Sequence, residues 1–89
     1  MNPPVALLTD FGHADPWVGV MKGVILGIAP GTALVDLVHE VPPGDVLCGA
    51  FHLDACVEAF PAETLFLAVV DPGVGTARRA LAARVGHWR

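Results

Sequence analysis

The chain has 89 residues and carries little charge for its size. Hydrophobic residues make up 54% of it and charged residues 16%, whereas globular proteins average about 25% charged residues. The length allows one small domain, and small domains bury the smallest fraction of their surface. We therefore expect the chain either to oligomerise or to form the first part of a longer polypeptide.

The same numbers argue against several classes of protein. A net charge of −4 does not suit a general nucleic-acid binder, which would show a basic stripe. The longest uncharged run, Gly23–Val35, contains Pro30 and Gly31 and falls short of the ~20 apolar residues of a membrane span. No basic N-terminal region of a signal peptide is seen. Cys48 and Cys56 are too few for a disulfide framework and lack further ligands at zinc spacing. Because no export signal is seen, we expect them to be buried thiols in a cytoplasmic protein.

The first half of the chain predicts a strand followed by a helix. Val5 to Thr9 is a short apolar run typical of a buried strand. Asp15 as N-cap and Pro16 at the first helical position start a helix that runs to about Ile28, where the Pro-Gly pair at 30–31 ends it. The helix is apolar nearly all round, so we expect it to be covered on most faces.

The second half repeats the alternation. A strand is predicted over 33–39, and Asp36 inside it must be paired or hydrogen-bonded; N–H groups of a neighbouring loop are one candidate partner. A mostly apolar helix over 45–59 begins at an aspartate cap. The segment 64–70 is the clearest strand, and 80–85 predicts a fourth, hairpin-paired to the third.

Strands that alternate with helices predict a three-layer α/β/α fold with a mainly parallel sheet, here an incomplete β-α-β-α-β-β portion of one. Ligands bind beyond the carboxyl ends of the strands in such sheets. This rule selects Asp10, His39 and Asp71, which we expect on one rim, with Gly73 beside them. Each has a plainer explanation: Asp10 and Asp71 can be turn residues, and His39 a hydrogen-bonded histidine at a strand end. The glycines at 73 and 75 do not complete a dinucleotide fingerprint.

Three motifs together resemble one enzyme family. TDFG at 9–12 with Asp15 and MKG at 21–23, VDLVHEVPPGDV at 35–46, and VVDPGVGTARR at 69–79 resemble the S-adenosylmethionine hydroxide adenosyltransferases, whose superfamily includes a fluorinase and a chlorinase. The resemblance implies a longer chain: an α/β/α domain, of which residues 1–89 are the N-terminal portion, and a C-terminal β-barrel domain absent here. It also implies a homotrimer that binds S-adenosylmethionine between subunits.

The resemblance further implies roles for individual residues. Asp10 hydrogen-bonds the ribose hydroxyls, while Asp71 and Arg78 are two catalytic residues that position water, with a later histidine as the third. Further substrate contacts are implied at Phe11, Asp15 and Gly73. The halogenating relatives have a tyrosine at the position of Asp71 and do not keep Arg78, so this pair favours hydroxide over halide.

The expected function is hydrolysis of S-adenosylmethionine to adenosine and methionine by attack of water at ribose C5′, without metal or cofactor. We expect it of the full-length protein and expect the 89-residue piece alone to be inactive. Two alternatives stay open: a non-catalytic module that binds a nucleoside or serves in packing, and an S-adenosylmethionine-dependent halogenase, which Asp71 disfavours.

Overall fold

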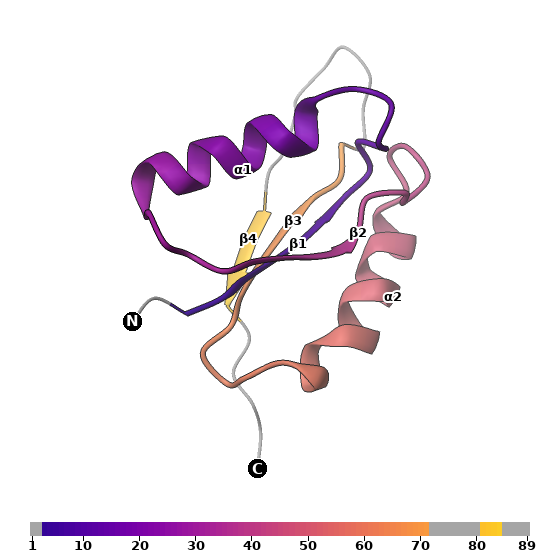
Figure 1. The fold of residues 1–89 in the computed structure, drawn as a ribbon. Coiled ribbons are helices and arrows are strands. Elements are labelled where there is room, and N and C mark those ends of the chain that lie inside the picture. Colours follow the sequence, from indigo (N-terminus) through magenta and orange to yellow (C-terminus); the bar gives the residue numbers. More distant parts are fainter. Residues whose placement is uncertain (1–2, 72–80, 85–89) are drawn as a thin grey trace.

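The computed structural model describes residues 3–71 and the backbone of residues 81–84 (Figure 1). Its elements in chain order are β1 (Val5–Thr9), α1 (Trp17–Ile28), β2 (Leu34–Val38), α2 (Val46–Cys56), the 3₁₀ turn η1 (Val57–Ala59), β3 (Leu65–Val69) and β4 (Leu81–Arg84). The predicted alternation of strands and helices is confirmed. β1 has the predicted bounds, and each other strand is one residue shorter at either end than the run that predicted it.

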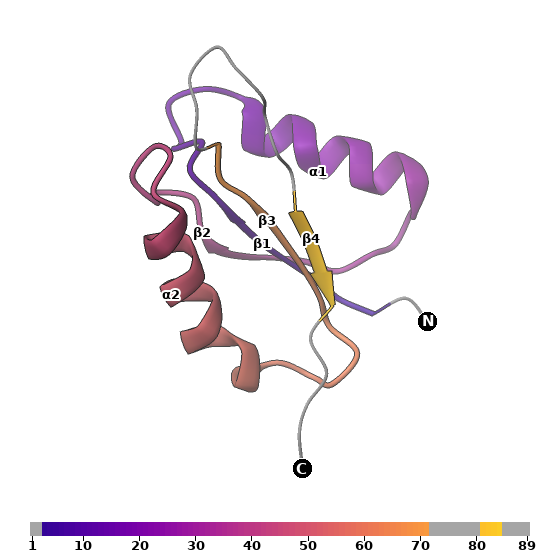
Figure 2. The ribbon, with the colours of Figure 1, turned by 180° about the vertical axis from the view of Figure 1, so that it is seen from behind.

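The strands form one sheet in the order β2-β1-β3-β4. β1 pairs in parallel with β2 and β3, so that Val5 lies opposite both Leu34 and Leu65. β4 pairs antiparallel with β3, as the predicted hairpin requires. The two views of the ribbon place α1 and α2 on opposite faces of this sheet (Figures 1 and 2). The expected α/β architecture is therefore confirmed.

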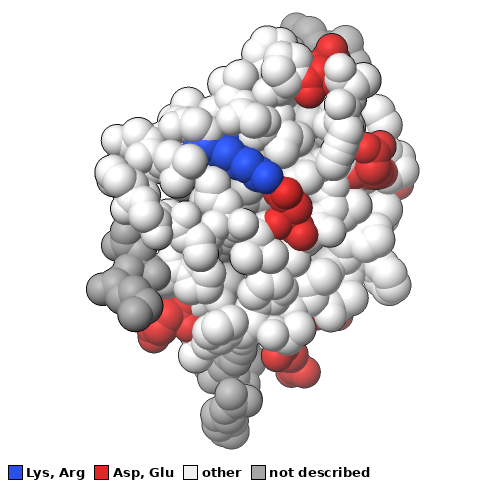
Figure 3. Space-filling model, in the orientation of Figure 1, with Lys and Arg blue, Asp and Glu red and all other residues white. Residues whose placement is uncertain are grey.

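Helix α1 is more exposed than its sequence predicts. It has no buried residue, and Trp17 is 56% and Ile28 81% exposed. One sheet contacts only one side of a helix, so within the described chain the other apolar faces of α1 meet solvent. The ion pair between Lys22 and Asp36 of β2, 2.7 Å apart, ties α1 to the sheet edge. Most of the face shown in Figure 3 is uncharged.

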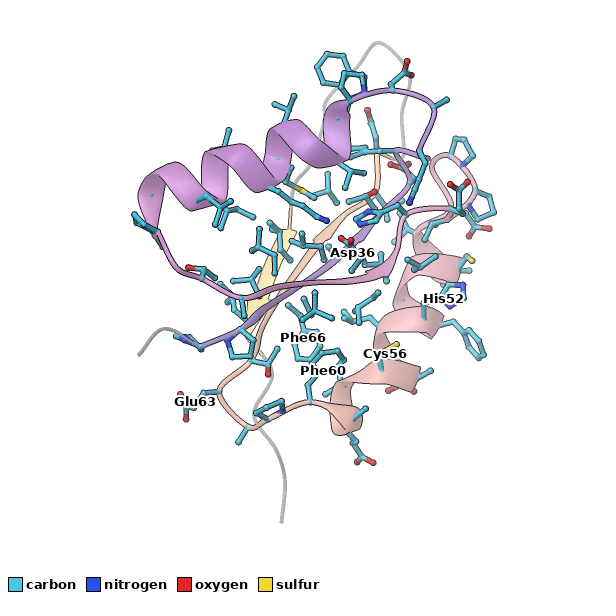
Figure 4. All side chains as sticks on the ribbon, viewed as in Figure 1. Asp36, His52, Cys56, Phe60, Glu63 and Phe66 are labelled. Carbon is cyan, nitrogen blue, oxygen red and sulfur yellow. The ribbon has the colours of Figure 1, made fainter. Side chains whose placement is uncertain are left out.

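The core lies between the sheet and α2. Phe66 of β3 is fully buried, and its ring meets that of Phe60 edge-on with centroids 5.6 Å apart (Figure 4). Gly49 lets α2 approach closely, because a Cβ there would lie 3.1 Å from Val70 Cγ2 and 3.5 Å from Leu8 Cδ2. Close packing on this side fixes where the loop before α2 meets the sheet.

Two local predictions differ from the structure. Asp15 does not cap α1: Pro16 is the N-cap residue and no side chain caps the helix, because the carboxylate of Asp15 lies one residue too early. Cys48 and Cys56 are free and half-buried rather than fully buried, since α2 covers the sheet with the narrow stripe around Gly49. Within the described residues no helix is both long and apolar enough to cross a membrane.

Candidate functional site

The carboxyl ends of β1, β2 and β3 meet at one edge of the sheet. The backbone N–H of Asp10 donates to the carbonyl of Val69 at 3.3 Å, and that of Gly12 donates to the carbonyl of His39 at 2.7 Å. These bonds connect the loop after β1 to both neighbouring strands. Asp10, His39 and Asp71 therefore share one rim, as parallel strands predict.

The carboxylate of Asp10 joins the loops at this rim. Its Oδ2 accepts hydrogen bonds from the backbone N–H of Gly44 at 2.9 Å and of Asp71 at 3.1 Å. The two donors are 34 and 61 residues away in the sequence, so Asp10 does not merely cap a local turn. Both bonds use Oδ2, which sets the orientation of the carboxylate.

Beside this rim lies a pocket of about 520 Å³ between α1 and the sheet. Asp10, Phe11 and Asp71 line one part of it, and the remaining walls are apolar, formed by Trp17, Val20 and Met21 of α1 and Leu67 and Val69 of β3. Sites for small molecules have about 300–1,000 Å³, mostly apolar walls and a few polar groups. Two acidic residues among apolar lining residues suit a ligand that combines a positively charged or hydroxyl-bearing part with an apolar body.

A second polar feature lies between the ends of β1 and β2. Thr9 Oγ1 and His39 Nδ1 are 2.8 Å apart, His39 Nε2 and Asp36 Oδ1 are 2.7 Å apart, and Lys22 Nζ donates to Asp36 Oδ2 at 2.7 Å. Asp36 lies on β2 on the side of α1 (Figure 4). The prediction that Asp36 is paired is confirmed, with Lys22 and His39 as partners in place of loop N–H groups.

Lys22 and His39 lower the pKa of Asp36, which makes its contribution to stability depend on pH. Desolvation raises the pKa of Asp36, but hydrogen bonds and charge from Lys22 and His39 outweigh it and hold that pKa below the ordinary 3.8. A lowered pKa stabilises the folded state above pH 3.8, and this stabilisation is lost as the pH falls through the lowered value. The carboxylate is 43% exposed, so its contribution is less than about 1 kcal/mol.

We therefore expect Asp36→Asn to lower the free energy of unfolding by less than about 1 kcal/mol at neutral pH. The difference from the unmodified chain should vanish as the pH falls below 3.8. Denaturant unfolding over a pH series measures both effects, with Glu58→Gln, an exposed carboxylate in η1, as the control. A difference that stays constant into acid would contradict this account of Asp36.

The structure brings together some of the predicted site residues and not others. Asp10, Phe11 and Asp71 line the pocket. Asp15 is exposed and is not among the residues that line it. Arg78 and Gly73 lie outside the described residues. The apolar wall from α1 was not predicted, although residues at 17, 20 and 21 have the spacing of one helix face.

Comparison with known proteins places the chain in one family. Residues 5–89 match the family described as SAM hydroxide adenosyltransferase N-terminal domain. The (R)-S-adenosyl-L-methionine hydrolase of Thermus thermophilus is 52% identical over 85 residues, which cover 96% of this chain and 33% of that protein. A fluorinase of an Actinoplanes species is 38% identical over 84 residues, covering 94% of this chain and 28% of the fluorinase.

Solved structures show the same relationship. The crystal structure of a conserved hypothetical protein from Thermus thermophilus superposes with a TM-score of 0.76 at 51% identity, covering 88% of this chain and 33% of that one. The chain thus spans about a third of the length of these relatives. Because the match to the family's N-terminal domain extends over almost all of its residues, the chain belongs to the SAM hydroxide adenosyltransferase family.

Proposed function

We propose that this domain binds S-adenosylmethionine and, in a chain of the length of its relatives, takes part in its hydrolysis to adenosine and methionine. The observation that carries the proposal is the pair of carboxylate residues, Asp10 and Asp71, at one part of an otherwise apolar pocket. The names of the most similar relatives support the same substrate.

The pocket suits this substrate for two physical reasons. S-adenosylmethionine is a sulfonium cation, and carboxylates in low-dielectric surroundings attract a cation more strongly than they do in water. Asp10 uses Oδ2 for the backbone N–H groups of Gly44 and Asp71, and we assign its Oδ1 to accept hydrogen bonds from ribose hydroxyls. The apolar walls then contact the uncharged parts of the substrate.

The proposed reaction is a displacement at C5′ of the ribose. The water oxygen forms a bond to C5′ while the C5′–S bond breaks. The electron pair of the C5′–S bond stays with sulfur, so methionine leaves as a neutral thioether. Water and S-adenosylmethionine thus give adenosine, methionine and a proton. The carboxylate of Asp71 accepts a hydrogen bond from the water and directs a lone pair at C5′, and Arg78 holds that carboxylate in place. The sulfonium charge is lost from the pocket as the attacking water gives up its proton, and apolar walls that keep out bulk water favour this loss of charge.

We further propose that the protein is cytoplasmic, that S-adenosylmethionine is its substrate without a cofactor, and that it forms the homotrimer that the resemblance of the three motifs implies. Gel filtration with light scattering on the full-length protein tests the assembly: a trimer supports it, and a monomer at working concentration contradicts it.

The activity is tested best in a chimera. Residues 5–89 replace the matching segment of the Thermus thermophilus hydrolase, to which this chain is 52% identical, and adenosine and methionine are measured after incubation with S-adenosylmethionine. We expect turnover comparable to that of the parent enzyme. The 89-residue chain alone should give no adenosine, because none of its four histidines matches the third catalytic residue that the resemblance implies.

Two outcomes would count against the proposal. A folded chimera that forms no adenosine contradicts a hydrolytic role for these residues. Formation of 5′-halo-adenosine that depends on chloride or fluoride would instead support the halogenase alternative.

A further inference from the structure

The hydrogen-bonded side chains between β1 and β2 (those of Lys22, Asp36, His39 and Thr9) connect to the backbone of the pocket wall. Thr9 Oγ1, besides its contact with His39, accepts a hydrogen bond from the backbone N–H of Phe11 at 3.2 Å. Phe11 lines the pocket beside Asp10. The proposed reaction uses neither Thr9 nor His39, so this connection calls for an explanation of its own.

When His39 is neutral, the direction of each hydrogen bond between Asp36, His39 and Thr9 is determined. The carboxylate of Asp36 only accepts hydrogen bonds, so in a neutral His39 it is Nε2 that carries the proton and donates to Asp36 Oδ1. Nδ1 then accepts from the hydroxyl of Thr9, whose oxygen also accepts from the N–H of Phe11. Asp36 is in turn held by Lys22. Each group thereby fixes the next, from α1 through β2 to the loop after β1.

Burial makes these contacts difficult to replace. Thr9 is completely buried and His39 is 2% exposed, so water does not readily substitute for a lost partner. His39 also holds the same loop through its carbonyl, which accepts from the N–H of Gly12 at 2.7 Å. The segment from Asp10 to Gly12 is thus fixed to His39 at two points, one by way of Thr9.

We propose that His39 is a positioning residue, which acts through Thr9 to hold the Asp10–Phe11 backbone in the conformation that binds the substrate. This inference rests on the proposed function and extends it. Since Asp10 and Phe11 hold the substrate and do not touch the attacking water, disturbing His39 or Thr9 should weaken substrate binding and change the chemical step little.

Thr9 provides a matched pair of variants for the test. Thr9→Val keeps the shape of the side chain and removes the hydroxyl, while Thr9→Ser keeps the hydroxyl. In the chimera, we expect Thr9→Val to raise KM about tenfold with a much smaller change in kcat, and Thr9→Ser to stay near the parent. Thr64→Val is the control: Thr64 is equally buried, but its Oγ1 has no hydrogen-bond partner among the described residues. It should leave KM unchanged.

Two variants of His39 separate its contacts. Asparagine at this position keeps an acceptor near Nδ1 and so within reach of Thr9, whereas glutamine extends toward Asp36 and leaves Thr9 without its partner. We expect His39→Asn to raise KM less than His39→Gln does. The unfolding temperatures of both variants are measured as well. If His39 had a purely structural role, the variant with the lower unfolding temperature would also have the higher KM.

A second measurement does not depend on activity. In the folded chimera and its variants, hydrogen exchange followed by NMR reports the protection of the Phe11 amide. We expect faster exchange in Thr9→Val and in His39→Gln, and no change in Thr64→Val.

The outcomes separate the two proposals. If the unmodified chimera makes no adenosine, the proposed function has failed, and the exchange of Phe11 still judges the connection through Thr9. If the chimera is active but Thr9→Val has the KM of the parent, or if Phe11 exchange is unchanged, the positioning role of His39 is overturned.

Discussion

Replacing Asp10 with alanine in the chimera is expected to lower kcat/KM for S-adenosylmethionine by about a thousandfold. The variant leaves the N–H groups of Gly44 and Asp71 without their acceptor, at about 1–3 kcal/mol for each group that stays unsatisfied. It also removes the acceptor that we propose for the ribose hydroxyls. Steady-state kinetics measures the loss, and thermal unfolding should show a lower midpoint because the loops are no longer joined.

Asp10→Asn separates these two effects. Its carbonyl oxygen can still accept from both backbone N–H groups, so the unfolding midpoint should stay near that of the parent. Its NH₂ group would replace Oδ1 as a donor and could not accept from hydroxyls, so KM should rise sharply.

Substrate analogues complete the test of Asp10. The parent should reject an analogue without ribose hydroxyls strongly, because such a substrate leaves Asp10 without partners, and Asp10→Asn should discriminate much less. An Asp10→Asn variant that binds and discriminates as the parent does would disprove the contact with ribose.

Local signals in the sequence predicted most of the fold. The apolar runs at 5–9 and 64–70 became β1 and β3, and the expected cap at Asp45 is present, with Oδ1 accepting from the N–H of Cys48 at 2.9 Å. These features depend on neighbours a few residues away. The start of α1 was placed one residue too early, since both Asp15 and Pro16 are residues that favour helix starts.

The exposure of α1 could not be read from its composition. An apolar helix indicates that something covers it, but the sequence of the helix does not say whether that partner is among the described residues. The structure shows that the sheet leaves much of α1 exposed.

The site was predictable where it depends on topology and unpredictable where it depends on distant partners. The rule for parallel strands is enough to place Asp10 and Asp71 on the same rim. The pairs Lys22–Asp36 and Thr9–His39 are 14 and 30 residues apart in the sequence, and no local pattern indicates them. Asp15 belongs to the same motif but is exposed and does not line this pocket, so its contact with the substrate stays a prediction.

Asp71→Asn is expected to lower kcat by about a hundredfold to a thousandfold and to raise KM by a much smaller factor. The substitution keeps the shape of the side chain and removes its charge. It also keeps the backbone N–H that donates to Asp10, so the loops and the binding site for ribose remain in place. What is lost is a charged acceptor able to hold and direct the attacking water. Steady-state kinetics in the chimera and calorimetry with S-adenosylmethionine measure the two quantities separately.

Asp54→Asn is the matched control for this charge, since Asp54 is an exposed carboxylate on α2, across the sheet from the pocket. It should leave both kcat and KM unchanged. Loss of an interaction that is made only in the transition state lowers kcat and kcat/KM by the same factor. Loss of an interaction that is made equally with the bound substrate raises KM and leaves kcat unchanged. Equal losses of turnover and of binding in Asp71→Asn would therefore mean that this carboxylate contributes only by attracting the sulfonium ion and has no role in orienting the nucleophile. The preference for water over halide would then have to come from another residue.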